Sequence, residues 1–388
     1  MTRDLVVFYL ARHAEGIGAF TRFVKSYKRN TSGIKHQLAI IYKGFENSED
    51  LATAREIFAE LDSGEICVTD DQFDIGAYIH AAGQIDSRYV CFMNTHTEIL
   101  SEGWLYHLRR AMDDPKVGMA GAHGSFESLY SSLAVTSKAV WLAGLVDAAP
   151  DPKLCDHYRF VISVHAPQAL KQEQPGTDLN HKQSWMDMIQ KRPWIELIQK
   201  RPWIEFLQKQ SWVDLIQKRS WREPFSPNQS PEMDERWAAF WGQKVAPGGV
   251  FDFLADFPRF PNPHIRSNCF IIERDALLSS FPSIEPTKKA SYGFESGPNS
   301  LTTRITRSGR HTAVVGRNGV IYNQARWPRS KTFRLGNQNN MLIADNQTRT
   351  FDLLSMHERA TYVMMTWGDS LFWAPPSYPL GFNFKMRS

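Results

Sequence analysis

A buried strand followed at once by polar residues constrains this chain more than any other feature. Residues 89–93 read Tyr-Val-Cys-Phe-Met, and a β-branched and aromatic run bounded by turn residues indicates a strand. Residues 94–97, Asn-Thr-His-Thr, follow directly and are called the polar turn below. A helix is expected over residues 104–112. Because ligands of open α/β sheets bind at the carboxyl ends of strands, the polar turn is the first place to expect chemistry.

Strand and helix patterns alternate through the first part of the chain. Continuous apolar runs are typical of parallel strands that are covered on both faces. Apolar residues at helical spacing separate these runs. The expected strands are 5–10, 38–42, 66–68 and 89–93, and the expected helices are 19–27, 50–61 and 75–82. This rhythm predicts an α/β fold with a parallel sheet and helices on both faces.

Composition excludes several classes of protein. The 388 residues are 42% hydrophobic and 22% charged, which is ample for a sizeable core. A formal charge of +4 is small for this length, so no nucleic-acid partner is expected. The four cysteines form no CxxC pair, so neither a zinc knuckle nor a redox motif is indicated. The chain has no apolar run of transmembrane length, and a cytoplasmic protein is expected.

A tandem repeat interrupts the α/β pattern. The units WMDMIQKRP, WIELIQKRP, WIEFLQKQS and WVDLIQKRS place a tryptophan every nine residues between Trp185 and Trp221. Pro193 and Pro202 would break a continuous helix, so short helical pieces are expected. One interpretation is peripheral contact with the inner face of the membrane, or with a protein partner, through tryptophan and basic residues. The other is a neutral duplication tolerated in a surface insertion.

These patterns divide the chain into four parts. Strands are expected again at 269–272 and 312–315, with a helix opening near residues 292–297, and a last amphipathic helix is expected over 351–367. The expected parts are 1–128, one half of an α/β domain; 129–249, a helical insertion containing the repeat at 185–221; 250–330, the other half of the α/β domain; and 331–388, a C-terminal helical extension.

Several segments together resemble a known family. FDIGAYIHAA, RYVCFMNTHTEILSEGWLYHL and GMAGAHGSFES are similar to the nucleotide-sugar half of family 2 glycosyltransferases with the GT-A fold. PNPHIRSNCFIIERDAL and FESGPNSLT resemble the acceptor loop and the catalytic carboxylate of that family. The resemblance covers roughly residues 5–128 and 257–325 and excludes the repeat. It implies a GT-A-like mixed, mostly parallel sheet with helices on both faces, to which the helical repeat insertion is added. The chain departs from the family where Asn94-Thr95-His96 replaces the usual Asp-x-Asp.

The resemblance implies a transferase of the hexosyltransferase type, active in polysaccharide biosynthesis. Such an enzyme moves a sugar from a nucleotide-sugar donor to a glycan or lipid-linked acceptor, here by a single inverting displacement. Glu295, expected at a transition from a strand to a helix, is predicted to be the base that takes the proton of the acceptor hydroxyl. Its alternative interpretation is a first-turn glutamate that the helix dipole favours. The alternative function is a catalytically inactive GT-A-like scaffold that binds a glycan or a nucleotide.

The resemblance also assigns binding residues. The donor is expected to meet Asp71, Asp74, Asn94, His96 and Arg266, and the acceptor side is expected to include Trp104, His264 and Asn268. The two aspartates could instead cap the following helix, and His96 could be a hydrogen-bonded loop residue.

Metal dependence stays open at this point. Asn94 and His96 could ligate Mn²⁺ or Mg²⁺, although imidazole suits transition metals better than Mg²⁺. Without a metal, the diphosphate would be neutralised by cationic side chains, because guanidinium groups bind phosphate in a bidentate manner. Arg266, Arg304 and His264 are the candidates for that role.

Overall fold

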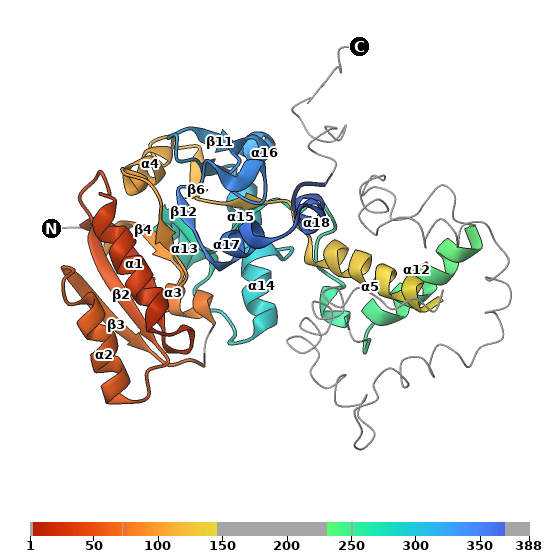
Figure 1. Cartoon of the computed structure of the whole chain (residues 1–388), viewed down its shortest axis with the longest axis horizontal. Coiled ribbons are helices and arrows are strands. Elements are labelled where there is room, and N and C mark those ends of the chain that lie inside the picture. The colour runs from red at the N-terminus through yellow and green to blue at the C-terminus, as the bar shows by residue number, and fades with distance from the viewer. Residues whose placement is uncertain (1–2, 72, 146–230, 250, 369–388) are drawn as a thin grey trace, which may run out of the picture. The chain divides into compact units, whose positions relative to one another are not determined.

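The computed structural model describes residues 3–71, 73–145, 231–249 and 251–368 (Figure 1). The chain divides into two compact units, one of residues 1–126 with 261–388 and the other of residues 127–260. The tryptophan repeat at 185–221, and both interpretations of it, lie outside the described residues.

Eight strands form the main sheet within the described part of the first unit. Their order is β11-β10-β6-β9-β4-β1-β2-β3. β9 runs antiparallel to β4 and β6, β11 runs antiparallel to β10, and the other pairs are parallel. The strands are β1 (Arg3–Arg12), β2 (Gln37–Lys43), β3 (Ser63–Val68), β4 (Ser87–Met93), β6 (Val117–Gly121), β9 (Cys269–Glu273), β10 (His311–Val315) and β11 (Ile321–Asn323). The mixed, mostly parallel sheet expected of a GT-A-like domain is confirmed.

Helices cover both faces of this sheet, which explains the unbroken apolar runs of its strands. Side chains alternate between the two faces of a strand. Tyr9 of β1 stacks on Phe23 of α1 with ring centroids 3.7 Å apart. On the opposite face, Phe92 of β4 stacks on Tyr78 of α3 at 4.7 Å. The helices of this unit are α1 (Ile17–Arg29), α2 (Ser48–Phe58), α3 (Asp74–Gly83), α4 (Trp104–Ala111), α13 (Arg274–Ser280), α14 (Lys288–Ser296), α15 (Leu301–Arg307), α16 (Trp327–Ser330), α17 (Asn346–Leu353) and α18 (Met356–Trp367).

Short strands and 3-10 turns complete this unit. β5 (Glu98–Ile99) pairs with β12 (Ile343–Ala344), and β7 (Gly124–Ser125) pairs with β8 (His264–Ile265), each antiparallel. The first pair joins the segment after the polar turn to the C-terminal part of the chain. The 3-10 turns are η1 (His13–Glu15), η3 (Gln324–Arg326) and η4 (Gly336–Gln338).

The register of the sheet brings one set of residues to a single edge. Arg12 at the end of β1 lies opposite Lys43 at the end of β2. Met93 at the end of β4 pairs with Cys269 at the start of β9. Because β9 is antiparallel, the residues that precede it reach the same edge as the carboxyl ends of β1, β2 and β4. The polar turn therefore lies beside residues 266–268.

The second unit is described for two helices and one 3-10 turn. These are α5 (Leu129–Leu145), α12 (Pro231–Val245) and η2 (Asp252–Leu254). Trp241 of α12 donates from Nε1 to the hydroxyl of Tyr130 at 2.9 Å and stacks on Trp237. Across the ranges that the structure describes, no helix has both the length and the apolar character to cross a bilayer.

Two local predictions were wrong. Residues 292–297 do not open a helix after a strand, because they form the end of α14 and the turn before α15. Gly297 and Pro298 end α14, and Ser300 caps α15. The expected single helix over 351–367 is two helices, since Ser355 and Glu358 form a capping box that starts α18. Capping by side chains outweighed the apolar periodicity in both places.

Candidate functional site

The polar turn is closed by its own hydrogen bonds and tied to β9. Asn94 donates its backbone N–H to the carbonyl of Asn268 at 2.9 Å. Thr97 donates from its backbone to the carbonyl of Asn94 and from its hydroxyl to Oδ1 of Asn94, both at 3.1 Å. The turn is thus fixed against the loop that carries Arg266.

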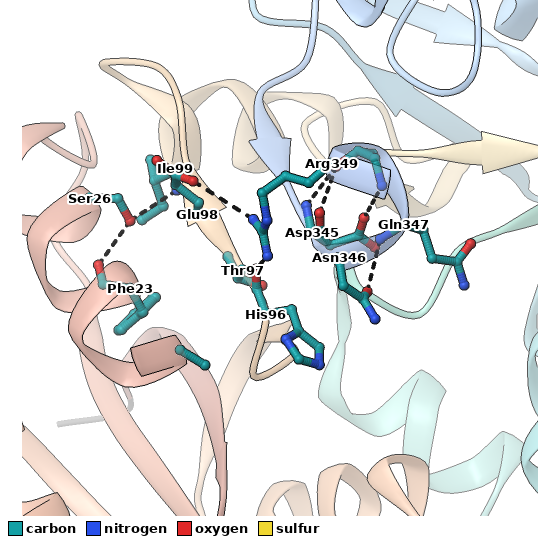
Figure 2. Close-up of polar contacts among 12 residues, drawn as sticks. Phe23, Ser26, His96, Thr97, Glu98, Ile99, Asp345, Asn346, Gln347 and Arg349 are labelled. Atoms are coloured by element: carbon teal, nitrogen blue, oxygen red, sulfur yellow. Dashed lines mark hydrogen bonds and ion pairs between the residues drawn. The ribbon is translucent and has the colours of Figure 1, made fainter. Parts of the chain in front are cut away.

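His96 is held from two sides. Its Nε2 lies 3.0 Å from Oε2 of Glu15, the last residue of η1 after β1. Its carbonyl accepts a hydrogen bond from Nη2 of Arg349 at 3.0 Å. Figure 2 shows Arg349 extending from α17 toward His96 and Glu98. The imidazole is therefore engaged with a carboxylate at the sheet edge.

A three-residue ionic network joins the carboxyl ends of β1, β2 and β3. Arg12 donates to both oxygens of Asp70, from Nε at 3.0 Å and from Nη2 at 2.9 Å. Lys43, only 1% exposed, also donates to Asp70. Hydrogen bonds from Arg12 and Lys43 lower the pKa of Asp70 to about 2. The sequence reasoning missed Arg12 and Lys43, although each is the last residue of its strand and could have been found from that position.

The two predicted donor-binding aspartates differ in their surroundings. Asp71 is exposed and accepts a hydrogen bond from Thr69. Asp74 is the half-buried first residue of α3, where Phe73 occupies the cap position. Burial raises the pKa of Asp74 despite nearby Lys43. Asp74 therefore belongs with the network at the sheet edge, and Asp71 lies outside the contacts described above.

Glu295 lies in the last turn of α14, so the first-turn interpretation of this residue is wrong. A helix dipole disfavours a carboxylate at that end, and other groups compensate. Ser267 donates its backbone N–H to Oε2 at 2.7 Å and its hydroxyl to the same oxygen. Oε1 lies 3.7 Å from Nη1 of Arg266 and 3.9 Å from Nε2 of His264. Burial raises the pKa of Glu295, but Arg266, His264 and Ser267 together outweigh it, and the pKa is lowered.

A small cavity of about 10 Å³ adjoins Glu295, which is room for roughly one water molecule. It is lined otherwise by Met119, Ile265, Ser267, Phe270, Phe294, Leu301 and Thr302. A sugar ring cannot fit in it. A substrate would have to meet the Oε1 side of Glu295 outside this cavity.

The predicted acceptor-side residues are largely enclosed. His264 is 2% exposed, and its Nδ1 lies 2.8 Å from the carbonyl of Asn262. Asn268 is buried with its Nδ2 2.7 Å from Nδ1 of His123. Trp104 is fully buried in the core beside Tyr27. In this structure its indole is not accessible to an acceptor, and it packs α4 onto the sheet.

The structure thus groups most of the predicted residues through one loop. Residues 264–268 carry His264, Arg266 and Asn268, and they contact both Glu295 and Asn94. Burial raises the pKa of the Tyr78 phenol, and the carboxylates of Asp74 and Glu295 add to this effect, so Glu295 lies near α3, the helix that begins at Asp74. His96 and Asp74 adjoin the ionic network. The individual roles of these residues stay predictions.

The two predicted metal ligands fit a metal poorly. His96 faces Glu15, and Oδ1 of Asn94 accepts from Thr97. Among the residues that the structure describes, no three His, Cys, Asp or Glu side chains gather in a group that could hold a metal ion. The cationic side chains at the sheet edge supply the positive charge of the site as it stands.

Comparisons with known proteins find similarity at the level of structure. No protein-family model matches the chain, and no curated protein sequence matches it. A 4-diphosphocytidyl-2C-methyl-D-erythritol synthase from Anaerococcus prevotii aligns at 9% identity over 32% of this chain and 57% of its own, with a TM-score of 0.25. S. aureus TarS aligns at 13% identity over 30% of this chain and 21% of its own, also with a TM-score of 0.25. A TarS structure limited to residues 1–349 aligns at 12% identity over 30% of this chain and 34% of its own, with the same TM-score.

The lowered pKa of Asp70 predicts an acid-dependent contribution to stability. A carboxyl whose folded pKa is depressed stabilises the fold above its unfolded pKa, and this is lost as the pH falls through the folded value. For Asp70 the window runs from 3.8 down to about 2. Because the side chain is 37% exposed, we expect only about 1 kcal/mol from it. Asp70→Asn should be less stable than wild type at neutral pH, and the difference should shrink across this window in urea unfolding.

The exposed Asp71→Asn is the matched control, and it should follow the wild-type curve. A stability difference between Asp70→Asn and wild type that stays constant from neutral pH to pH 2 would contradict the ionic role of Asp70.

Proposed function

We propose that this chain is a glycosyltransferase that takes a sugar from a nucleotide-sugar donor and passes it to a glycan or lipid-linked acceptor. The observation that carries the proposal is the gathering of ionised groups at one edge of the sheet. Arg12, Lys43 and Asp70 come from the ends of the parallel strands, and Glu295 lies against the loop before β9. Strand ends of open α/β sheets are where nucleotide ligands bind.

Glu295 has the ionised carboxylate and the fixed side-chain orientation that a general base requires. Its lowered pKa keeps it ionised at neutral pH. Two donors from Ser267 fix Oε2, so the carboxylate has one defined orientation. In the proposed step, the acceptor hydroxyl loses its proton to Glu295 as its oxygen bonds the anomeric carbon. The bond from that carbon to the diphosphate breaks on the opposite face, so the configuration inverts.

The leaving diphosphate would meet positive charge near the same loop. Arg266 and His264 lie beside Glu295 and are the cationic groups expected to neutralise developing negative charge. Guanidinium groups pair with phosphate oxygens in a bidentate manner. The step therefore uses side chains of this chain to stabilise the leaving group.

The alternative is a binding scaffold without catalysis, and one observation favours it. The carboxylate of Glu295 already accepts two hydrogen bonds and lies near the guanidinium of Arg266 and the imidazole of His264. These contacts lower its basicity as well as its pKa. A scaffold would bind a nucleotide sugar or a glycan at the same edge and leave it intact.

A two-stage measurement separates these functions. Thermal unfolding of the full chain would be followed with a panel of nucleotide sugars, with and without Mn²⁺ or Mg²⁺. A binding donor at 100 times its Kd stabilises a protein by about 2.7 kcal/mol. Release of nucleoside diphosphate with a candidate acceptor would then support the enzyme, and binding without release would support the scaffold. No shift with any nucleotide sugar would contradict the proposed donor.

A further inference from the structure

Arg22 on α1 is a half-buried cation in an unusual position. The structure gives its guanidinium no hydrogen bond and no ion pair within the described ranges. Three residues before it, the carbonyl of Ala19 accepts from the hydroxyl of Tyr9 at 3.4 Å. Four residues after it, the hydroxyl oxygen of Ser26 accepts from the backbone of Ile99 at 3.0 Å. Residues three and four apart share a helix face, so Arg22 faces the segment that contains the polar turn.

Arg349 reaches the same segment from α17 (Figure 2). Its Nη2 donates to the carbonyl of His96, while its Nη1 is buried without a hydrogen bond and lies 3.7 Å from Oε2 of Glu98. The preceding carbonyl, of Thr95, accepts from the hydroxyl of Tyr9 at 2.7 Å. Tyr9, Arg22 and Arg349 therefore converge on one side of the polar turn.

The electrostatics agree with this placement. Burial raises the pKa of the Tyr9 phenol, and both Arg22 and Arg349 oppose that rise. Burial lowers the pKa of Arg349, and the like charge of Arg22 lowers it further. Two guanidinium groups are thus near enough to repel each other.

The nearby acids do not neutralise this pair closely. Asp345 accepts from the backbone of Thr348 at 2.8 Å as the cap of α17. Glu98 lies 3.7 Å from Arg349 and 3.8 Å from Nη2 of Arg29, and both distances exceed hydrogen-bond length. Glu15 already lies in contact with Arg12 and His96. A charged donor therefore remains available on Arg22.

We propose that Arg22 and Arg349 form a binding site for a phosphate group of a ligand, on the α1 side of the polar turn. A phosphate accepts paired hydrogen bonds from a guanidinium fork. Its negative charge would also relieve the repulsion between the two arginines. Phosphate binding here does not require sugar transfer, so it would hold even if the proposed transferase activity failed.

Anion titration of the full chain tests the site. Inorganic phosphate and pyrophosphate would be titrated by calorimetry at constant ionic strength, so that a single phosphate and a diphosphate are compared. Arg22→Gln should weaken binding of the preferred anion about tenfold, as expected for the loss of one charged hydrogen-bonding group. Lys25→Gln removes one exposed charge from the same helix and should change the affinity less than about twofold.

A second variant separates the effect of the paired hydrogen bonds of a guanidinium from the effect of its positive charge. Arg349→Lys keeps the positive charge but loses the paired hydrogen bonds. Its affinity for the anion should therefore lie between the affinities of the wild type and of Arg22→Gln. Circular dichroism would show that each variant is folded. Equal losses for Arg22→Gln and Lys25→Gln would mean nonspecific attraction and would overturn the site. So would wild-type protein that binds neither anion at millimolar concentration.

Discussion

Glu295→Gln is expected to reduce the turnover of sugar transfer by roughly 10²–10⁴-fold, the contribution typical of a positioned general base. Glutamine keeps the size of the side chain and can still accept from Ser267, but it cannot take up the proton of an acceptor hydroxyl. Donor affinity should change far less than turnover, because Arg12, Lys43 and Asp70 pair with one another at the ends of the parallel strands, and Arg266 loses only one neighbouring negative charge. The measurement is steady-state transfer with a donor found by the thermal screen, together with donor affinity by calorimetry.

Glu273→Gln is the matched control for this change. Glu273 ends β9 and pairs with Arg310 at 2.6 Å, so its loss removes a carboxylate of the same unit without touching the loop that carries Arg266. Its turnover should stay within about threefold of wild type. If Glu295→Gln transfers sugar at the wild-type rate, Glu295 is not the base, and its bonds to Ser267 have a structural role.

The fold was predictable from sequence because the sheet has two covered faces. The runs at 5–10 and 89–93 contain no polar alternation, and Tyr9, Phe8 and Phe92 are all buried in the structure. Such runs are typical of strands that are covered on both faces, and in this chain helices provide the cover. The break between α17 and α18 at Ser355 was not predicted. The capping box that starts α18 involves only a few residues, and the apolar periodicity of the longer segment hides it.

The site was predictable only where its residues follow strands in sequence. Asn94 and His96 come directly after β4, so the sequence placed them at the sheet edge. Glu295 was expected after a strand, whereas it lies at the end of α14 and meets the site through Ser267. The contact of Arg349 with His96 spans 253 positions, and only the fold shows it.

Buried packing, in contrast to such long-range polar contacts, allows a direct stability prediction. Phe92→Ala is expected to destabilise the first unit by about 3–5 kcal/mol, the usual cost of truncating a buried phenylalanine. Phe92 is fully buried and contacts the rings of Phe8, Tyr78 and Phe270 from three elements. Urea unfolding followed by circular dichroism measures the change in the free energy of unfolding.

Two further variants make this test specific to the interior of β4. Tyr106→Ala removes a ring that is 44% exposed on α4, and it should cost about 1 kcal/mol or less. Phe92→Leu refills part of the space and should recover some of the loss. A Phe92→Ala protein no less stable than Tyr106→Ala would show that this ring cluster is not central to the fold.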